Sequence, residues 1–484
     1  MSVRRSAYFS FGTRNAGVLI NFVATLVIAR LLTPDEIGVF AVSAAFVMIS
    51  QIIRDSGIGS YIIQERDLTR ENLRTAMGVS LLIGAMLGGM IFVLAEPLAR
   101  FYAEPGVEDV LLILVFSFVL APVNAVGLAL LRRDLAFGTA FWIETTSNLV
   151  WSSVAVALAY GGYSYHSMAW ASVAATSTIC LLFVIVRREL ILIRPSLKQW
   201  RRVFRFGSIV TLTQLLSQVG VLAPALVLGR VADFSAVAFY NRGNSLTRMF
   251  RDTVERGAAV VALPAFSAEL RRGAFNKPGY CYATALMTGI SWPFFGLIAI
   301  LAYPIVRILF GDQWDAAVPV VQLLAIAHMI RGPVALAPEL TTAQGAVRLG
   351  LLREIIVQSA RVVIIVLCAF HGVVAVAAGQ IAATLLALIV NQTIVNRLVG
   401  LTAGELAEAC LRSVAVAVAT AVGPILVVVF LPPTPTFLWE PLLLGLATGG
   451  LGWLVGIAVT GHPLRGEMSI VFRKSRAVLS PRRA

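Results

Sequence analysis

Val79–Leu94 reads VSLLIGAMLGGMIFVL, an apolar run without a charged side chain. Basic residues precede the run at Arg66, Arg70 and Arg74, and the acidic Glu96 follows it. A transmembrane α-helix needs about 20 apolar residues, whereas a β-barrel strand would alternate polar and apolar residues. The run therefore predicts a membrane-spanning helix whose basic end lies on the cytoplasmic side.

The whole chain repeats this pattern. Its 484 residues are 58% hydrophobic and 13% charged, with a mean hydropathy of +0.85, whereas a soluble domain carries about 25% charged residues. We therefore expect an all-α, multi-pass membrane protein with about 14 transmembrane helices. Basic connections alternate with acidic or neutral ones, which places both termini in the cytoplasm. The expected helices lie near residues 12–31, 37–63, 73–95, 109–131, 138–160, 165–186, 204–229, 237–263, 281–309, 316–340, 350–370, 372–396, 405–431 and 439–460.

Composition and motifs exclude several classes of protein. The net charge of +14 and the pI of about 10.3 are explained by short basic loops that set topology and contact anionic lipids, so we expect no nucleic-acid partner. The four cysteines and four histidines are scattered, which predicts neither a disulfide framework nor a metal site. Walker A, GxSxG and HExxH motifs are absent, so we expect a protein without enzyme activity or a cofactor. No cleavable signal peptide is recognisable, and the first helix is expected to direct insertion.

The sequence contains a weak internal repeat with an offset of 200 residues. Arg30 aligns with Arg230, and Asp55 aligns with Glu255. In each copy an apolar helix ends at an arginine, a short turn follows, and the next helix carries a carboxylate two residues before a glycine. Any single pair is compatible with chance, but agreement with the expected helices favours a repeat. We expect an N-terminal lobe at 1–190 (helices 1–6), a C-terminal lobe at 191–400 (helices 7–12), and helices 13–14 with a basic cytoplasmic tail at 401–484.

Polar side chains are concentrated in the first two helices of each half. Charged groups within a bilayer are costly unless they face a cavity or a partner. A hydrophilic cavity is the natural explanation, because transporters built from repeats bind substrates between their halves. The candidate cavity residues are Arg14, Asn21, Arg30, Gln51, Arg54, Gln214, Gln218, Asn241 and Arg242.

Most of these arginines also have a structural interpretation. Arg14 is equally compatible with an anchor at the membrane interface. Arg54 is equally compatible with a local ion pair with Asp55. Arg30 ends a helix, where contact with the last carbonyl groups would be sufficient to explain it. For Arg242 we favour a role in the cavity, because hydrogen-bonding residues surround it in the sequence.

Carboxylates within the helices are candidates for ion coupling. Asp55, Glu144 and Glu255 are the three candidates, although Glu144 would equally serve to satisfy its polar neighbours. A second polar group follows further along the chain, and we favour interhelical contacts over a cavity or lipid-head-group role for it. Its members are Gln322, His328, Arg331, Glu339, Arg353, Glu354, Gln358 and Arg361.

Five short motifs carry a resemblance to a known family. They are Ala29–Gly38 (ARLLTPDEIG), Arg54–Gly57 (RDSG), Phe239–Arg242 (FYNR), Leu263–Ser267 (LPAFS) and Leu309–Trp314 (LFGDQW). With these motifs in order over most of its length, the chain resembles the Wzx-type oligosaccharide flippases and polysaccharide exporters of the multidrug/oligosaccharidyl-lipid/polysaccharide superfamily.

The resemblance implies two six-helix lobes in a V shape, two further helices, and alternating access to a central cationic cavity. The implied substrate is an undecaprenyl-diphosphate-linked oligosaccharide in the bacterial inner membrane, for exopolysaccharide or O-antigen. Family members use cavity arginines against the diphosphate, which assigns this role to Arg54, Arg242 and Arg30. Guanidinium groups suit this task because they donate paired, charged hydrogen bonds to phosphate.

One departure from the related lipid II flippases concerns the first helix. Val18 and Ala24 stand where those proteins have arginines, which argues against lipid II as substrate and leaves Arg14 as a substitute. Two alternatives stay open, a cation-coupled drug exporter and a non-transporting scaffold of a polysaccharide-assembly complex. A drug cation would favour acidic cavity walls, which disfavours the exporter. Expected partners are the lipid-linked oligosaccharide, membrane lipids, and candidate polymerase and export proteins.

Overall fold

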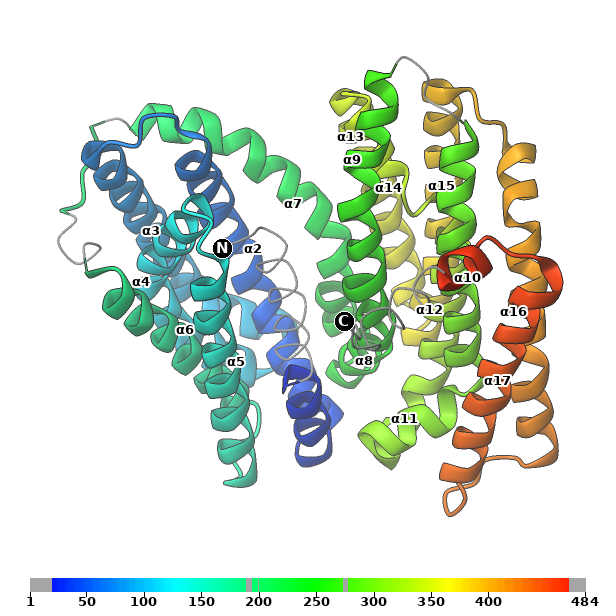
Figure 1. Cartoon of the computed structure of the whole chain (residues 1–484). Coiled ribbons are helices and arrows are strands. Elements are labelled where there is room, and N and C mark those ends of the chain that lie inside the picture. The colour runs from blue at the N-terminus through cyan, green and yellow to red at the C-terminus, as the bar shows by residue number, and fades with distance from the viewer. Residues whose placement is uncertain (1–19, 189–193, 199, 273–276, 470–484) are drawn as a thin grey trace, which may run out of the picture. The chain divides into compact units, whose positions relative to one another are not determined.

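The computed structural model describes residues 20–188, 194–198, 200–272 and 277–469 (Figure 1). This part of the chain contains helices and no β-strand, apart from one isolated bridge between Thr434 and Phe437. Ten of its helices are long and apolar enough to cross a membrane. The prediction of an all-α membrane protein is confirmed. The predicted count of 14 spans is not confirmed, because four of the expected segments do not meet the criteria of length, hydropathy and charge among the described residues.

Contacts divide the chain into two compact units, residues 1–238 and 239–484. In the first unit α2 packs against α3, α4 and α7, and α5 packs against α6. Phe183 and Ile62 have no exposed surface in its core. The predicted lobes at 1–190 and 191–400 follow the repeat and stay a prediction. The helices of this unit are Ile20–Leu31, α2 (Pro34–Gln64), α3 (Arg70–Tyr102), α4 (Pro105–Arg133), α5 (Phe137–Tyr160), α6 (His166–Val186), α7 (Trp200–Val231) and the start of α8 (Phe234–Phe250).

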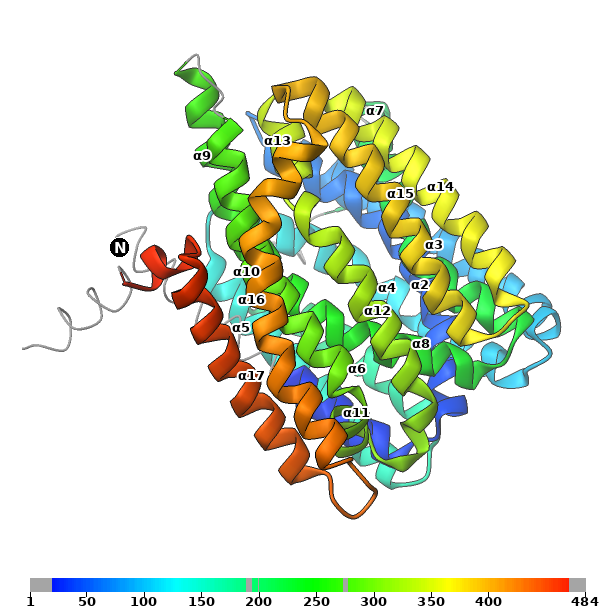
Figure 2. The ribbon, with the colours of Figure 1, turned by 90° about the vertical axis from the view of Figure 1, so that its right-hand side faces the viewer.

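The second unit continues from α8 to α17. In it α14 runs beside α15, and α16 runs beside α17 (Figure 2). Tyr280 and Leu340 are fully buried in its main apolar cluster. After α8 come η2 (Arg251–Glu255), α9 (Arg256–Arg271), α10 (Lys277–Ile300), α11 (Ala302–Phe310), η3 (Asp312–Ala317), α12 (Val318–Arg331), η4 (Gly332–Val334), α13 (Ala337–Ala343), α14 (Val347–Ala369), α15 (Val373–Val399), α16 (Ala403–Phe430) and α17 (Trp439–Thr460).

The TPDEIG motif starts a helix. Thr33 and Glu36 form a capping box at the first turn of α2, and Pro34 occupies the first helical position, where a missing N–H costs nothing. Gly38 is required by close packing, because a Cβ atom there would lie 1.9 Å from the carbonyl oxygen of Phe234. These motif residues therefore have structural roles.

The same turn occurs again 200 residues later. The helix Ile20–Leu31 precedes α2, which begins at Pro34, and α7 ends at Val231 before α8 begins at Phe234. The Asp233 carboxylate accepts a hydrogen bond of 2.5 Å from the backbone N–H of Ala236. A side-chain cap at equivalent positions supports the internal repeat predicted from the sequence.

Two predicted helices of the second unit are interrupted. The expected span 281–309 breaks at Leu301 between α10 and α11, and the span 316–340 breaks at η4. Pro304 lies just after the first break and Pro333 lies within η4, and proline lacks the N–H that an uninterrupted helix would use. Between α8 and α9 the chain adopts a π-helical turn at Arg251–Glu255, a feature that is frequent at functional sites.

Candidate functional site

Arg54 on α2 is buried in the first unit, with 5% of its side chain exposed. Its Nε and Nη2 donate hydrogen bonds of 2.6 and 2.7 Å to the two carboxylate oxygens of Asp55. The guanidinium lies over the Phe118 ring at 5.5 Å from the ring centre. Nη1 is buried and has no hydrogen-bond partner among the described residues. The local ion pair is present, and a buried donor stays unsatisfied beside it, which is costly in the absence of a ligand.

An apolar cavity of about 950 Å³ adjoins Arg54. Side chains of α2, α3 and α7 line it, and Leu82, Met86, Trp200 and Leu215 represent its hydrocarbon walls. Several of these side chains are about half exposed, so the cavity is open at its edge. Its shape and chemistry suit a hydrocarbon chain more than a sugar.

A second cavity of about 410 Å³ borders Asp55. Its lining mixes apolar side chains with charged and amide groups, and we call it the polar cavity for these groups. Asp55, Glu144 and Gln214, three of the predicted residues, line it together. Arg132 and Asn124 also line this cavity, and neither was among the predicted site residues. The Asn124 Oδ1 is buried without a hydrogen-bond partner among the described residues. This cavity thus gathers acceptors and donors from α2, α4, α5 and α7.

Arg242 on α8 is the corresponding buried arginine of the second unit, with 9% of its surface exposed. Its guanidinium carbon lies 5.0 Å from the Trp314 ring centre and 5.5 Å from that of Phe310. Its Nε is buried without a hydrogen-bond partner, and no described carboxylate forms an ion pair with it. Cation–π contacts offset part of the cost of burying the charge. A buried cation without an anionic partner among the described residues is destabilising, so Arg242 is a candidate for binding an anion.

Two of the quoted motifs meet at Arg242. Trp314 has no exposed surface, and its ring packs against Phe239 at 5.9 Å and Phe310 at 6.1 Å. FYNR therefore supplies the arginine, and LFGDQW supplies the aromatic rings around it. The resemblance pointed to both motifs, but their spacing in sequence gave no signal that they form one site.

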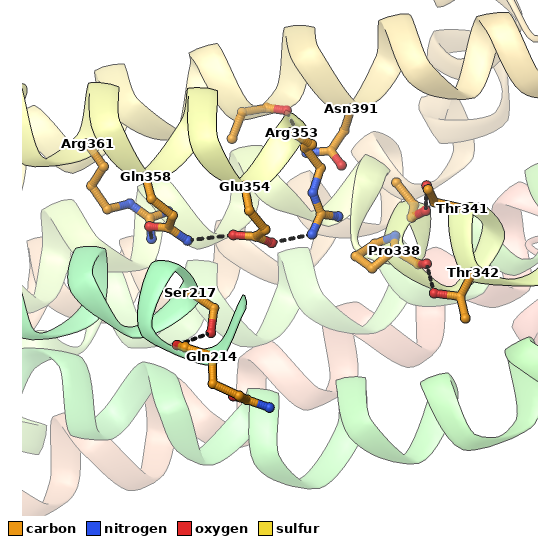
Figure 3. A network of polar contacts seen from close by, with 12 residues as sticks. Gln214, Ser217, Pro338, Thr341, Thr342, Arg353, Glu354, Gln358, Arg361 and Asn391 are labelled. Atoms are coloured by element: carbon orange, nitrogen blue, oxygen red, sulfur yellow. Dashed lines mark hydrogen bonds and ion pairs between the residues drawn. The ribbon is translucent and has the colours of Figure 1, made fainter. Parts of the chain in front are cut away.

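The second polar group contains a row of side chains along α14 (Figure 3). Arg353 pairs with Glu354, which accepts a hydrogen bond of 3.0 Å from Gln358. Arg361 then donates to the Gln358 side chain at 3.2 Å. These hydrogen bonds run along one helix, while Arg353 also interacts electrostatically with Glu339 of α13, and Arg361 with Arg331 of α12. The expectation of interhelical contacts for this group stays a prediction. Spacings of three and four place Glu354, Gln358 and Arg361 on one face.

An interhelical ion pair does occur elsewhere in this group. Arg331 at the end of α12 lies 2.9 Å from Glu255 in the π-helical turn, and 11% of the Glu255 side chain is exposed. The pair gives the mostly buried Glu255 carboxylate a counter-ion from another helix. Its predicted role in ion coupling stays a prediction.

The other predicted residues are less distinctive. Arg14 lies outside the described residues. Arg30 is exposed at the end of its helix. Glu144 and Gln214 are exposed, and Gln214 accepts a hydrogen bond from Ser217 through its backbone carbonyl (Figure 3). Asn21, Gln51, Gln218 and Asn241 are half-buried.

A family profile decides the affiliation of the chain. The profile described as "Polysaccharide biosynthesis protein" matches residues 27–319, more than half of the sequence. The chain belongs to this family. The matched segment contains Arg54, Arg242 and Trp314, whereas α14 to α17 lie beyond it. The resemblance read from the motifs is confirmed.

Three bacterial relatives of the polysaccharide biosynthesis family align with the chain. The teichuronic acid biosynthesis protein TuaB of Bacillus subtilis is 24% identical over 65% of this chain and 65% of its own length. The succinoglycan biosynthesis transport protein ExoT of Rhizobium meliloti is 26% identical over 69% of this chain and 67% of its own. The lipopolysaccharide biosynthesis protein WzxC of Escherichia coli is 23% identical over 64% of each. The alignments thus cover less than two thirds of TuaB and WzxC.

Solved structures share the fold of the chain. The lipid II flippase MurJ, in an inward closed conformation, superposes with a TM-score of 0.77 at 11% identity, covering 93% of this chain and 99% of MurJ. An inward-facing multidrug resistance MATE family transporter of the MOP superfamily gives a TM-score of 0.63 at 15% identity, covering 82% and 95%. At these identities the likeness concerns the fold.

Proposed function

We propose that the protein is a flippase that moves undecaprenyl-diphosphate-linked oligosaccharide repeat units across the bacterial inner membrane by alternating access. The repeat units would belong to an exopolysaccharide or an O-antigen. In this proposal both termini lie in the cytoplasm, 1–190 and 191–400 act as related lobes, and the chain is a transporter without enzyme activity.

The observation that carries the proposal is the state of the two buried arginines. Among the described residues, Arg54 and Arg242 each keep a buried nitrogen without a hydrogen-bond partner, and Arg242 has no carboxylate partner. A diphosphate is a compact dianion whose oxygens accept paired hydrogen bonds from guanidinium groups. Bound at either arginine, it would satisfy the free donor there, and polar side chains of the same unit would provide hydrogen bonds to the glycan.

The relatives support this class of substrate. TuaB, ExoT and WzxC are named for teichuronic acid, succinoglycan and lipopolysaccharide biosynthesis, and ExoT is named a transport protein. All three names concern polysaccharides, which favours a lipid-linked glycan over a drug. Polymerase and export proteins of the same pathway are the partners that the proposal expects, and co-purification would test them.

A binding measurement tests the role of Arg242. Purified protein is titrated with an undecaprenyl-diphosphate-linked oligosaccharide, and Arg242→Ala is expected to weaken binding by at least about tenfold because it removes a buried charged donor. Arg307→Ala is the matched control. Arg307 also lies over an aromatic ring, Tyr303, but it has a carboxylate partner in Asp315 at 3.4 Å. Equal affinity for wild type and Arg242→Ala would remove the arginine from the proposed site.

A further inference from the structure

The ion pair of Arg54 and Asp55 borders two cavities, one almost wholly apolar and one that also contains charged and amide groups. Arg54 lines the apolar cavity, whereas Asp55 lines the polar one. Exposure differs in the same sense, since 5% of the Arg54 side chain and 43% of the Asp55 side chain are exposed. Arg54 therefore has little access to water, while Asp55 has much more.

This difference determines which partner can leave the pair. A guanidinium as buried as that of Arg54 needs a counter-ion, because an uncompensated buried charge is strongly destabilising. A carboxylate as exposed as that of Asp55 can be hydrated, and Arg132 in the same cavity offers it a second cation. An anionic ligand can thus replace Asp55 at Arg54 without leaving either charge buried and unpaired.

The apolar cavity raises a problem of selectivity. Its walls are hydrocarbon, so they would accept the chain of an ordinary phospholipid as well as a polyprenyl chain. A phospholipid also presents a phosphate to Arg54, and phospholipids surround the protein in great excess. Discrimination must therefore come from the head group.

We propose that Asp55 is a specificity-determining residue that makes Arg54 select a diphosphate over a phosphodiester. Asp55 already occupies Nε and Nη2 in a bidentate pair. A phosphodiester carries one negative charge and gains little by replacing a carboxylate of equal charge. A diphosphate carries at least two and has more oxygens, so it can displace Asp55 and also reach the unpartnered Nη1. The Asp55 carboxylate thus competes with the ligand for Arg54, and this competition provides the specificity. This inference rests on the proposed function.

The apolar cavity would then hold the hydrocarbon chain of the substrate. The polyprenyl chain next to the diphosphate lies there, because the arginine on its wall requires an anionic head group and Asp55 excludes singly charged ones. Phospholipid binding at this place in the wild type is the alternative that the following test examines.

Asp55→Asn tests the inference. Affinities for undecaprenyl diphosphate and for dioleoylphosphatidylglycerol are measured on detergent-purified protein by native mass spectrometry. The variant is expected to bind phosphatidylglycerol roughly tenfold more tightly than wild type, a change within the range of coupling between two binding sites. The ratio of its affinities for undecaprenyl diphosphate and phosphatidylglycerol should therefore fall. Asp67→Asn is the matched control, because it makes the same change at an exposed carboxylate of the same unit that lines neither cavity. It should keep the wild-type preference.

An unchanged preference in Asp55→Asn would overturn the inference. Asp55→Ser, which also removes the charge, gives the same test if the asparagine variant does not fold. Arg54→Ala separates this result from a failure of the proposed function. If wild type and Arg54→Ala bind undecaprenyl diphosphate equally, the proposed role of Arg54 is itself wrong. If Arg54→Ala loses binding while Asp55→Asn keeps the wild-type preference, the selectivity role alone is wrong.

Discussion

Trp314 shows how one side chain organises a site. It has no exposed surface and lies against Phe239, Phe310 and the guanidinium of Arg242. The indole thus fills the core and also provides the face on which the cation rests. Its loss would affect both packing and the position of Arg242.

Trp314→Ala is expected to destabilise the protein by about 3–5 kcal/mol, the cost typical of removing a buried tryptophan. Thermal stability in detergent, followed by size-exclusion chromatography after heating, measures the effect. Trp439→Ala is the control, because 60% of Trp439 is exposed at the start of α17. Equal melting temperatures for the two variants would show that the indole does not support this core.

At the residue scale the sequence predicted the charges better than their surroundings. Arg54 and Arg242 were candidates because charged groups in apolar helices need a reason. The pairing of Arg54 with Asp55 was one of two open alternatives. The aromatic rings around Arg242 could not be predicted. Trp314 lies 72 positions further along the chain, and aromatic residues are common in any membrane helix.

Helix α2 offers a direct comparison of two glycines. A Cβ atom at Gly38 would lie 1.9 Å from the Phe234 carbonyl oxygen, whereas nothing lies within 4 Å of the equivalent atom at Gly59. Gly38→Ala should therefore cost roughly 1–3 kcal/mol or prevent folding, because backbone must move. Gly59→Ala should be neutral or stabilise the helix by up to about 1 kcal/mol. Melting temperatures in detergent compare them, and a tolerated Gly38→Ala would contradict the tight packing of α2.

The segment after α17 is held by a buried histidine. His462 has 1% of its surface exposed, and its Nε2 lies 3.0 Å from the Ser413 hydroxyl of α16. The backbone N–H of Leu464 donates to Nδ1 at 3.2 Å, which requires Nδ1 to be unprotonated. The neutral ring therefore donates from Nε2 to Ser413. Burial lowers the pKa of His462, and the nearby Arg412 adds to this effect.

A lowered pKa in the folded state makes stability depend on pH. The unfolded chain binds the proton more readily, so stability is constant above about pH 6.5, the ordinary histidine pKa, and falls as the pH drops below it. Melting temperatures between pH 7.5 and 5.5 should show this fall. His462→Asn should flatten it, whereas His371→Asn, at an exposed position after α14, should keep it. A wild-type slope in His462→Asn would assign the fall to other groups.

At the scale of the whole molecule the helices could be predicted, because apolar runs indicate membrane spans and charged loops indicate the connections between them. Every expected segment has a helical counterpart among the described residues, and the caps at Thr33 and Asp233 mark the repeat. The breaks at Leu301 and η4 were missed, because proline near a helix end does not distinguish a kink from a new start. The two cavities of the first unit could not be predicted, since each combines side chains from several distant helices.

In the proposed function the two buried arginines have the same role, which is to bind the anionic substrate. Each compact unit contains one, on α2 and on α8, and both lie within the segment that the family profile matches. Each is held by a different device, a carboxylate in one unit and aromatic rings in the other. We therefore expect both arginines to contribute to transport of the anionic substrate, so that losing both abolishes transport while the fold persists.

Transport in proteoliposomes tests this claim most directly. Protein is reconstituted with an undecaprenyl-diphosphate-linked oligosaccharide placed in one leaflet, and arrival in the other leaflet is followed by accessibility to a glycan-cleaving enzyme. Wild type and Arg307→Ala should move the lipid. The doubly substituted Arg54→Ala, Arg242→Ala protein should insert and elute normally but move none above protein-free vesicles. Transport by the double variant at the wild-type rate would contradict the account.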